Sequence, residues 1–445
     1  MTTPGHPSPS HCQIIPPFLL ERLGAGRGDQ APVVDIGATL DIDASIRSRR
    51  ASAPQAPAAA DSPFAVYDAE SGSDLPGQLV RKKGDPESKD VAVNEAYAGV
   101  EATLALYQEV YDRSSFDDHG AEVRASVHFE KDYDNAFWNG DQLVFGDGDG
   151  TVFERFTIAV DVLGHELTHA VTQYAANLTY QDQSGALNES VSDVFGSCVK
   201  QRLAGESAAD ADWLIGEGLF KPEIHGVALR SMQAPGTAYD DPAIGKDPQV
   251  ATMDDYVDTA DDNGGVHTNS GIPNKAFYLA ATAIGGSSWD GAGKVWYAAL
   301  TSGLAADTDF ATFAAATVVA ATAVSSEAER AVTDAWAGVG VTPAASSGST
   351  GEQPSVPAQR GSVSVTRSGG FAGISKTGAV ALGDDPRTPE VESLLDRIDF
   401  ATVAPAAPQP DRFVYTFDVH GERTVVGEPD LTPELHRLAG IVLPD

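Results

Sequence analysis

The chain has 445 residues, of which 42% are hydrophobic and 21% are charged. This apolar content excludes a wholly disordered chain, and the length allows two or three domains with cores of their own. No apolar run is long enough for a transmembrane helix. The formal net charge is −35, with 64 acidic against 29 basic residues. Such an excess argues against nucleic acid or an anionic membrane as the main partner, and solubility is its simpler explanation.

The first 62 residues read as a short leader followed by a linker. An apolar patch at 12–23 is interrupted by Pro16 and Pro17, and no basic region precedes it, so we expect no conventional secretory signal. Residues 51–62 are rich in Ala and Pro, which is typical of a linker. The basic cluster at 47–50 before this linker suits proteolytic processing.

The remaining chain divides into a large globular region and a small C-terminal domain. We predict an α/β lobe at 63–155, a helix-rich lobe at 156–341, a linker at 342–360 and a small α+β domain at 361–445. The fold class is therefore α+β, with a cleft expected between the two lobes. The individual elements expected from hydrophobic periodicity are, in chain order, a helix at Ala92–Tyr111, a strand at Ala125–Phe129, a turn cluster at 146–150, strands at Ser362–Thr366 and Arg412–Val419, and helices at Pro389–Ile398 and Thr432–Leu438.

The most informative motif is His165-Glu166-Leu167-Thr168-His169, inside the apolar helical stretch Thr157–Tyr174. Positions i and i+4 of a helix lie about 40° apart around its axis, so both imidazoles leave the same face. That spacing suits two zinc ligands, and Glu166 is positioned to accept a proton from a water that the metal acidifies. A chance pentapeptide on a buried helix is the alternative.

A second helical stretch, Gly185–Asp193, offers a third ligand. Two histidines and Glu189 would leave a fourth coordination position for water, which is the pattern of a catalytic zinc site. Asp193 lies one helical turn after Glu189 and, with Asn188, is a candidate to hold the second nitrogen of a ligand imidazole. Taken alone, this stretch would read as an amphipathic helix with solvated acidic side chains.

These residues resemble the thermolysin family of zinc endopeptidases. The resemblance covers about residues 65–341, and it implies a two-lobed fold with a zinc cleft between an N-terminal α/β lobe and a C-terminal helical lobe. It also implies hydrolysis of internal peptide bonds in proteins or peptides. The segments that carry it are HELTHAVTQYAANLTYQDQSGALNESVSDVFG at 165–196, YDNAFWNG at 133–140, GDGDG at 146–150, ALRSM at 228–232 and DDNGGVHTNSGIPNKAFY at 261–278.

The resemblance implies a role for each matched residue. The two motif histidines and Glu189 correspond to the ligands of one catalytic zinc ion, and Glu166 corresponds to the general base. His267 and Tyr180 correspond to the groups that stabilise the oxyanion, and Asp262 to the carboxylate that orients His267. The groups that correspond to contacts with the substrate backbone are Asn135, the carbonyl of Ala136, and Arg230.

Substrate preference follows from an apolar pocket in the same family. A pocket of this kind prefers a bulky apolar side chain directly after the cleaved bond. The presence of two phenylalanines suggests a pocket shallower than usual, and each residue could also be plain core. The matching residues are Phe153, Phe156, Val162, Ile215, Leu219 and Leu229.

The calcium site that thermolysin carries near its zinc helices is altered here. Asp161, Asp212 and Glu217 remain, but the two other matching positions hold Lys200 and Leu214. Calcium needs six to eight oxygen ligands. We therefore expect that the calcium site is lost and that the Lys200 ammonium pairs with the remaining acids. A lysine that simply points into solvent is the alternative.

The short leader resembles the propeptide of the protealysin branch, in which a Pro-Pro-Leu motif lies in the primed subsites. Here the corresponding plug is Pro16, Pro17 and Phe18, with Leu19 next, so the register is open. A rigid Pro-Pro pair resists cleavage and suits an inhibitory segment. Cys12 could cap the zinc as a thiolate or be an ordinary small apolar residue.

The C-terminal domain resembles emfourin, a proteinaceous inhibitor of protealysin-like enzymes. The resemblance rests on 363–374, 411–415 and 431–435. A tethered inhibitor has a millimolar effective concentration, so we expect inhibition of the enzyme by its own C-terminal domain as well as by its propeptide. An accessory β module that binds substrate or a surface is the alternative.

Two other functional readings stay open from the sequence. A catalytically silent thermolysin-like protein could act as an inhibitor or binding module, although the intact HELTH motif, Glu189 and His267 argue against it. An aminopeptidase could share the zinc motif, although no amine-binding motif is evident. The family resemblance favours secretion, and the lack of a visible signal leaves cytoplasmic residence or leaderless export open.

Overall fold

The computed structural model of the chain separates into two compact units, residues 1–347 and 348–445. Cys12, the basic cluster at 47–50 and most of both expected linkers lie outside the described residues. The described residues are 13–24, 37, 39–40, 62–344, 362–369, 376–381, 387–395, 397–398, 413–419, 422–427 and 431–443.

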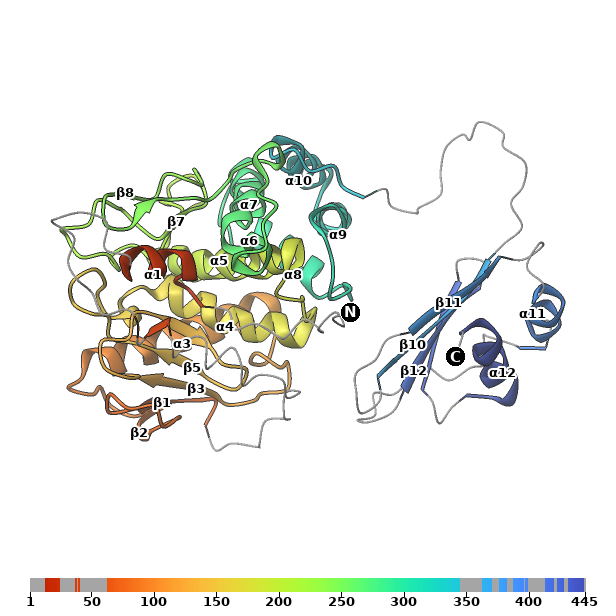
Figure 1. Ribbon diagram of the computed structural model, residues 1–445, viewed down its shortest axis with the longest axis horizontal. Helices are drawn as coiled ribbons and strands as arrows, with labels where there is room; N and C mark the ends of the chain where they lie inside the picture. The colour runs from red at the N-terminus through yellow and green to blue at the C-terminus, as the bar shows by residue number, and fades with distance from the viewer. Residues whose placement is uncertain are drawn as a thin grey trace, which may run out of the picture. The chain divides into compact units, whose positions relative to one another are not determined.

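The N-terminal lobe of the first unit is built on a five-stranded sheet in the order β2-β1-β3-β5-β4 (Figure 1). β1 (Phe64–Asp68) is antiparallel to β2 (Gln78–Lys82) and parallel to β3 (Val123–Val127). β5 (Leu143–Phe145) is parallel to β3 and antiparallel to β4 (Ala136–Trp138). Because β4 is an edge strand, its outer side offers backbone groups to an extended peptide.

Helix α3 (Val91–Tyr111) packs against β1 and β3 on one side and against α4 on the other. It begins after Asp90, whose Oδ1 accepts hydrogen bonds from the backbone N–H groups of Ala92 at 2.8 Å and Val93 at 3.3 Å. It ends at Asp112, which takes a left-handed conformation with φ 54°. The helix therefore ties the sheet to the helical lobe.

Two central helices, α4 (Val160–Ala175) and α5 (Asp182–Ala204), cross where two glycines meet. A Cβ atom on Gly196 would lie 2.4 Å from the carbonyl oxygen of Asp161, and one on Gly164 would lie 2.9 Å from the Cα of Gly196. No other residue allows backbones to approach so closely. This contact brings the HELTH motif of α4 against the acidic residues of α5.

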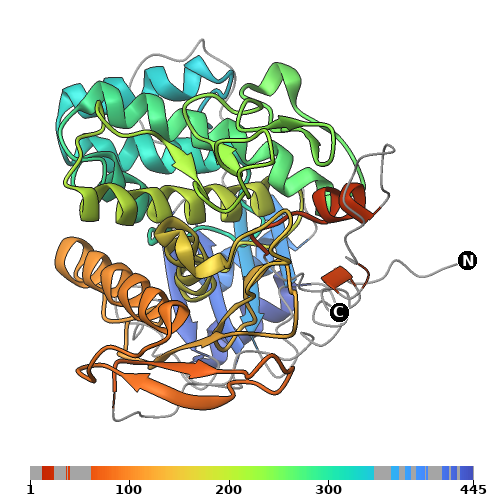
Figure 2. The same ribbon diagram turned by 90° about the vertical axis from the view of Figure 1, so that its left-hand side faces the viewer.

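Further helices of the C-terminal lobe lie mainly on the side of α5 away from the sheet (Figure 2), and α8 also contacts α3. Short strands and 3₁₀ turns lie between the longer elements along the chain. The helices are α6 (Asp262–Asn269), α7 (Gly271–Ile284), α8 (Ala292–Leu300), α9 (Phe310–Thr322) and α10 (Ser326–Gly338). The short elements are η1 (Phe156–Ile158), β6 (Leu214–Ile215), β7 (Arg230–Ser231), β8 (Asp240–Asp241), β9 (Gly245–Lys246) and η2 (Met253–Asp255).

The N-terminal segment belongs to the same core as the two lobes. Helix α1 (Pro17–Gly24) buries Leu19, Leu20 and Leu23 in the main apolar cluster of the unit. On its other face, Arg22 approaches the β8–β9 hairpin, with Nη1 3.4 Å from the carbonyl oxygens of Ile244 and Lys246. The segment is therefore anchored to the C-terminal lobe.

The described residues of the second unit form a four-stranded antiparallel sheet and two helices. Its strand order is β11 (Lys376–Ala381), β10 (Ser362–Gly369), β12 (Phe413–Val419) and β13 (Glu422–Gly427). Helices α11 (Thr388–Leu395) and α12 (Pro433–Val442) contact each other, and α12 contacts β10 and β11. The described residues of this unit form a separate apolar core.

Most expected elements have a counterpart, with shifted ends. The α+β class, the helix over 92–111 and the helices and strands expected in the C-terminal domain are present. The strand expected at Ala125–Phe129 instead spans Val123–Val127, because pairing with β1 sets its register and His128 leaves the strand with φ 54°. Strands β11 and β13 were not predicted from the sequence.

His128 joins three segments of the N-terminal lobe through two carboxylates. Its Nδ1 lies 2.8 Å from Asp147 Oδ2, and its Nε2 lies 3.0 Å from Oδ2 of Asp90, the cap of α3. The hydrogen bond to Asp147 raises the pKa of His128, burial lowers it, and the remaining interactions with Asp147 and Asp90 raise it further, from 6.5 to about 9.

A pH-dependent stabilisation by His128 is expected. Because the pKa is higher in the folded chain, the stabilisation is complete below pH 6.5 and is lost as the pH rises through about 9. Its size is about 1–2 kcal/mol, since the carboxylates are partly exposed. Urea unfolding at about pH 6.5 and about pH 10 should show this loss in the native chain but not in His128→Gln. Equal losses in both chains would contradict it.

Candidate active site

Three buried side chains converge where α4 meets α5. The Nε2 atoms of His165 and His169 lie 2.9 Å apart. Glu189 Oε2 lies 3.6 Å from Nε2 of His165, and Oε1 lies 3.6 Å from Nε2 of His169. These three residues form a candidate metal site, and it comes from the i,i+4 pair of α4 and the facing turn of α5.

The outer nitrogens of the two imidazoles are held by acceptor oxygens. Nδ1 of His165 lies 2.8 Å from Asp193 Oδ1, and Nδ1 of His169 lies 2.9 Å from Asn188 Oδ1. Each ring therefore carries its proton on Nδ1 and turns an unprotonated Nε2 inward. Burial lowers the pKa of His165 to about 4 and that of His169 to about 3, which keeps both rings neutral.

A cation fits this arrangement of donors. Two nitrogen lone pairs and a carboxylate at such short distances repel one another unless a positive charge lies between them. Glu189 Oε2 is buried and has no hydrogen-bond partner among the described residues. Two imidazoles and one carboxylate are a donor set that zinc accepts.

Glu166 lies beside this site, held at one oxygen and free at the other. Its Oε2 accepts a hydrogen bond of 2.9 Å from the backbone N–H of Trp138 in β4. Its Oε1 is buried and has no partner among the described residues. Burial and the charge of Glu189 raise the pKa of Glu166 well above its usual range. A carboxylate of this kind is a candidate proton acceptor.

A histidine and a tyrosine face the same site from the C-terminal lobe. His267 Nδ1 lies 2.7 Å from Asp262 Oδ1, and His267 Nε2 lies 3.2 Å from the Tyr180 hydroxyl. The Tyr180 hydroxyl also donates to Glu189. Burial lowers the pKa of His267, but Asp262 and Glu189 raise it by more, to about 9. The arrangement can present two donors to one oxygen.

The turn before His267 depends on residues that tolerate positive φ. Asp262, Asn263, Gly264 and Gly265 have φ values of 51°, 51°, 84° and 71°. A Cβ on Gly264 would lie 2.0 Å from Asp182 Oδ1. This tight turn lets the Asp262 carboxylate reach the ring that follows it.

Asp193 connects the candidate metal site to Arg230. Besides His165, its carboxylate accepts from Arg230 Nη2 at 2.7 Å and Nε at 2.8 Å, and from Asn274 Nδ2 at 2.8 Å. Burial alone would raise the pKa of Asp193, but Arg230 and His165 outweigh it and hold the pKa well below its usual range. The buried Arg230 side chain is thereby fixed in position.

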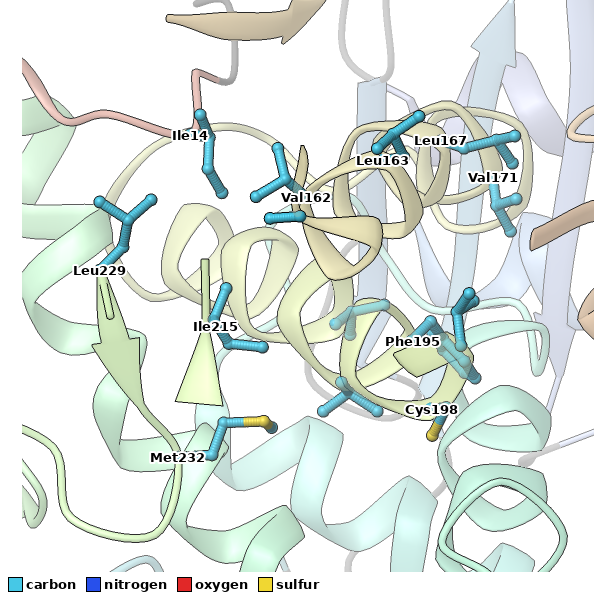
Figure 3. Packing of buried hydrophobic residues seen from close by; sticks show 14 of the residues in the cluster. Ile14, Val162, Leu163, Leu167, Val171, Phe195, Cys198, Ile215, Leu229 and Met232 are labelled. Carbon is cyan, nitrogen blue, oxygen red and sulfur yellow. The ribbon is translucent and has the colours of Figure 1, made fainter. Parts of the chain in front are cut away.

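A segment of the N-terminal leader lies against β4 and Arg230, next to the candidate metal site. The N–H of Ile14 donates to the carbonyl of Ala136 at 3.1 Å, and Arg230 Nη1 donates to the carbonyl of Ile14 at 3.1 Å. Asn135 accepts from the N–H of Ile15 at 3.0 Å and donates to its carbonyl at 3.2 Å. Figure 3 shows the Ile14 side chain among Val162, Ile215 and Leu229.

The expected pocket residues are all buried. Their relative exposures are 3% or less, and they belong to the apolar cluster that includes Ile14. The two phenylalanine rings of the set lie 5.7 Å apart between centroids. The residues are Phe153, Phe156, Val162, Ile215, Leu219 and Leu229.

Comparison with known proteins gives a consistent result. Residues 51–173 match the thermolysin metallopeptidase catalytic domain, and residues 176–341 match the thermolysin metallopeptidase alpha-helical domain. An extracellular metalloprotease of Pectobacterium carotovorum subsp. carotovorum is 48% identical over 310 residues, which cover 69% of this chain and 89% of that protein. The chain belongs to the thermolysin family of metallopeptidases.

Two further relatives indicate to which branch of the thermolysin family this chain is similar. Protease PrtS of Photorhabdus sp. (strain Az29) is 52% identical over 280 residues, covering 62% of this chain and 76% of that protein. The solved precursor of protealysin, a metalloproteinase from Serratia proteamaculans, matches with a TM-score of 0.68 and 49% identity, covering 74% of this chain and all of that one. Residues 365–442 match emfourin. The predicted protealysin-like branch, the two-lobed fold and the emfourin domain are confirmed.

Metallopeptidases of the thermolysin family use zinc, and the three converging ligands suit that metal. In the part of the chain that the structure describes, no helix has the length and apolar character needed to cross a membrane.

Lys200 contacts the acidic residues at the position where a lost calcium site was expected from the sequence. Its Nζ lies 2.8 Å from Asp212 Oδ2, 3.2 Å from Glu217 Oε2 and 3.8 Å from Asp161 Oδ2. A further 3.4 Å contact reaches the carbonyl oxygen of Leu214. Burial raises the pKa of Asp161 to about 6, while Lys200 acts in the opposite direction. The lysine therefore points into the cluster and not into solvent.

The plug was predicted at Pro16, Pro17 and Phe18; the hydrogen bonds to β4, Asn135, Arg230 and His267 are made by residues 13–15, directly before them. Proline has no N–H to donate to an edge strand, so the isoleucines before the Pro-Pro pair can make these bonds and the prolines cannot. Ser192, whose Oγ lies 3.0 Å from His169 Nδ1, and Asn274 were also missed. Both lack a spacing pattern that points to the site.

Proposed function

We propose that this chain is the zymogen of a zinc endopeptidase that hydrolyses peptide bonds on the N-terminal side of bulky apolar residues. The observation that carries the proposal is a backbone segment held along β4 beside the metal-binding residues and Glu166. An edge strand that binds extended backbone, next to a metal site and a buried base, suits internal peptide bonds of proteins or peptides.

The side chains around the cleft supply the other steps. Zinc bound by the two motif histidines and Glu189 would polarise the scissile carbonyl and acidify a water. Glu166 accepts the proton of that water at Oε1 and returns it to the leaving amine. His267, held at Nδ1 by Asp262, donates from Nε2 to the carbonyl oxygen as negative charge builds there, and Tyr180 adds a second donor.

The substrate backbone is held by three groups. Arg230 binds the first carbonyl group after the scissile bond, and Asn135 binds the N–H and the carbonyl group of the next residue. The Ala136 carbonyl accepts a hydrogen bond from the N–H of the scissile bond itself. The apolar pocket is supported by the burial of Ile14 in it and selects a bulky apolar side chain. The partners proposed are therefore protein or peptide substrates, with the chain's own propeptide as the first occupant.

The test follows the zinc-loaded full chain over time. Intact mass is recorded alongside cleavage of quenched peptides blocked at both ends, with Leu or Asp after the scissile bond and with Glu166→Ala as the control chain. Cleavage of the Leu peptide but not of the Asp peptide, absent in the control, is expected. Cleavage only of peptides with a free amino terminus would overturn the proposal in favour of an aminopeptidase.

We also infer that no calcium is bound beside the zinc helices, because the Lys200 ammonium supplies the positive charge. Calcium titrated calorimetrically into the metal-stripped chain should give no tight binding, while zinc should bind. Lys200→Met should lower the free energy of unfolding by about 2 kcal/mol, since Asp161 stays buried without its partner. Lys294→Met, which breaks an exposed pair with Asp290, should change it little. Tight calcium binding would contradict this inference.

The emfourin domain is proposed to restrain the enzyme after the propeptide leaves. Because residues 13–15 fill the cleft, a second occupant can bind only once they are removed. Deletion of 361–445 should therefore raise kcat/KM of the processed chain for a blocked peptide by at least about tenfold, as expected for a tethered inhibitor at millimolar effective concentration. Unchanged activity and unchanged active-site titration after the deletion would contradict the inhibitory role.

We propose that the protein is secreted. The support is that the relative from Pectobacterium carotovorum is called an extracellular metalloprotease. Detection of the chain in the culture medium of its producing cells, with a cytoplasmic marker retained in the cells, tests this. Retention of the chain with the marker would contradict it.

A further inference from the structure

The N-terminal segment lies across the cleft in the manner of a peptide added to a sheet. Gln13 pairs antiparallel with Phe137 of β4, and the Ile14 N–H donates to the Ala136 carbonyl at 3.1 Å. Two side chains then hold the backbone that follows, Arg230 at the Ile14 carbonyl and Asn135 at both backbone groups of Ile15. The segment therefore runs in a single direction and a single register.

This register brings one peptide bond to the candidate catalytic groups. The carbonyl oxygen of Gln13 lies 2.9 Å from His267 Nε2, the nitrogen that also lies 3.2 Å from the Tyr180 hydroxyl. The bond that follows this carbonyl is Gln13–Ile14. The Ile14 side chain, on the far side of that bond, lies in the apolar pocket with Val162 and Leu229.

We propose that Gln13–Ile14 is a cleavage site of this enzyme, hydrolysed by the active site of the same chain. The inference rests on the proposed endopeptidase function and adds a specific first substrate. The bond between the Gln13 carbonyl carbon and the Ile14 nitrogen breaks. Water supplies a hydroxyl group to the Gln13 carbon and a proton to the Ile14 nitrogen, so a carboxylic acid and an amine form and nothing is oxidised or reduced.

Neighbouring bonds in the segment are poorer substrates. The bonds Ile15–Pro16 and Pro16–Pro17 contribute a proline nitrogen, which has no N–H for the Ala136 carbonyl. Residues from Pro17 onward are helical in α1, so their backbone is not available in extended form. Among the described bonds of the leader, Gln13–Ile14 is the one whose carbonyl oxygen lies 2.9 Å from His267 Nε2.

Cleavage at this bond does not by itself empty the cleft. The chain after Ile14 remains anchored by Leu19, Leu20 and Leu23, which are buried in the main core, and by Arg22 on the β8–β9 hairpin. The Ile14 side chain keeps its pocket, and Arg230 keeps its carbonyl partner. Loss of residues 1–13 is therefore expected to precede the appearance of activity toward an added peptide.

The experiment measures the N-terminus of the zinc-loaded full chain over time. Intact mass and N-terminal sequencing should show a product that begins at Ile14, and its first-order rate constant should stay unchanged over about a hundredfold dilution because both partners are one molecule. Glu166→Gln should show no such product. A rate proportional to concentration, or a product absent at all times, would overturn the proposal.

Two variants at one position separate this inference from the proposed function. Ile14→Leu keeps a bulky apolar side chain and should still be cut. Ile14→Asp should be cut about 100-fold more slowly, because a carboxylate enters the apolar pocket unfavourably, and its cleft should accept an added blocked peptide earlier. If Ile14→Asp cleaves the added peptide while the native chain never yields an Ile14 end, the inference fails and the proposed function stands. If the chain freed of both its leader and residues 361–445 cleaves no blocked peptide, the proposed function fails.

Discussion

Replacing Glu166 with glutamine is expected to lower kcat/KM for a blocked peptide by about 10³-fold, the effect typical of losing a general base. The bound zinc should stay at one ion per chain, because Glu166 is not one of the three converging ligands. The measurement is kcat/KM of the native and variant chains after an added protease has removed the leader from both, together with their metal content. A variant that keeps more than about a tenth of the activity would place the base elsewhere.

The reason for so large an effect lies in the two oxygens of this carboxylate. Oε2 accepts from the Trp138 N–H, so the side-chain amide of the Glu166→Gln variant would keep its oxygen there and turn its NH₂ group toward the position of Oε1. That position is buried and without a partner among the described residues. An amide NH₂ in this position cannot accept a proton, while the side chain keeps its volume and the fold is spared.

Glu166→Asp separates chemistry from packing. It keeps the carboxylate but withdraws it by one methylene, so it should retain more activity than the glutamine variant, although misplacement alone costs up to about 100-fold. Equal activities of the two variants would argue that position, and not proton transfer, is what Glu166 supplies.

The parts of the site that the sequence predicts are those set by local geometry. His165 and His169 face one way because any helix does this at i and i+4. The approach of Glu189 depends on the crossing of α4 and α5 at Gly164 and Gly196, which no spacing within either helix reveals. Its assignment came from its place in the helical stretch that follows the HELTH motif and from the family resemblance, and not from periodicity.

The sequence also did not predict which residues of the leader pair with β4. The plug was predicted at residues 16–18 because the Pro-Pro pair is the most recognisable motif of the leader. The position of an edge-paired segment is instead decided by which N–H groups can reach which carbonyls, and this favours Ile14 and Ile15. A search for backbone N–H donors directly before the proline pair would have identified Ile14 and Ile15.

The largest effect outside the catalytic groups is expected for Asp193→Asn. Zinc affinity should fall by about 10- to 100-fold, as for other groups that orient a metal ligand. The free energy of unfolding should fall by about 3–5 kcal/mol, because Arg230 stays buried without a counter-charge. Competition with a zinc chelator and urea unfolding of the metal-free chain measure the two effects separately.

The expected effects of Asp193→Asn are large because the two oxygens of Asp193 accept hydrogen bonds from three side chains. Oδ1 accepts from His165 and Arg230, and Oδ2 accepts from Arg230 and Asn274. Asparagine has one acceptor oxygen, so its NH₂ group would face donors on one side whichever way it is turned. The matched control is Asp212→Asn, which makes the same change in a half-exposed carboxylate of the Lys200 cluster. It should leave zinc affinity unchanged.

A kinetic readout tests whether Asp193 also serves the substrate. Arg230, which Asp193 holds with two hydrogen bonds, is the residue that donates to the Ile14 carbonyl at 3.1 Å. Asp193→Asn at saturating zinc should therefore still raise KM for a blocked peptide, and Asp193→Glu, which keeps the charge, should restore part of both properties. If saturating zinc restores KM in full, Asp193 acts on the metal alone and the grip of Arg230 on the peptide is independent of it.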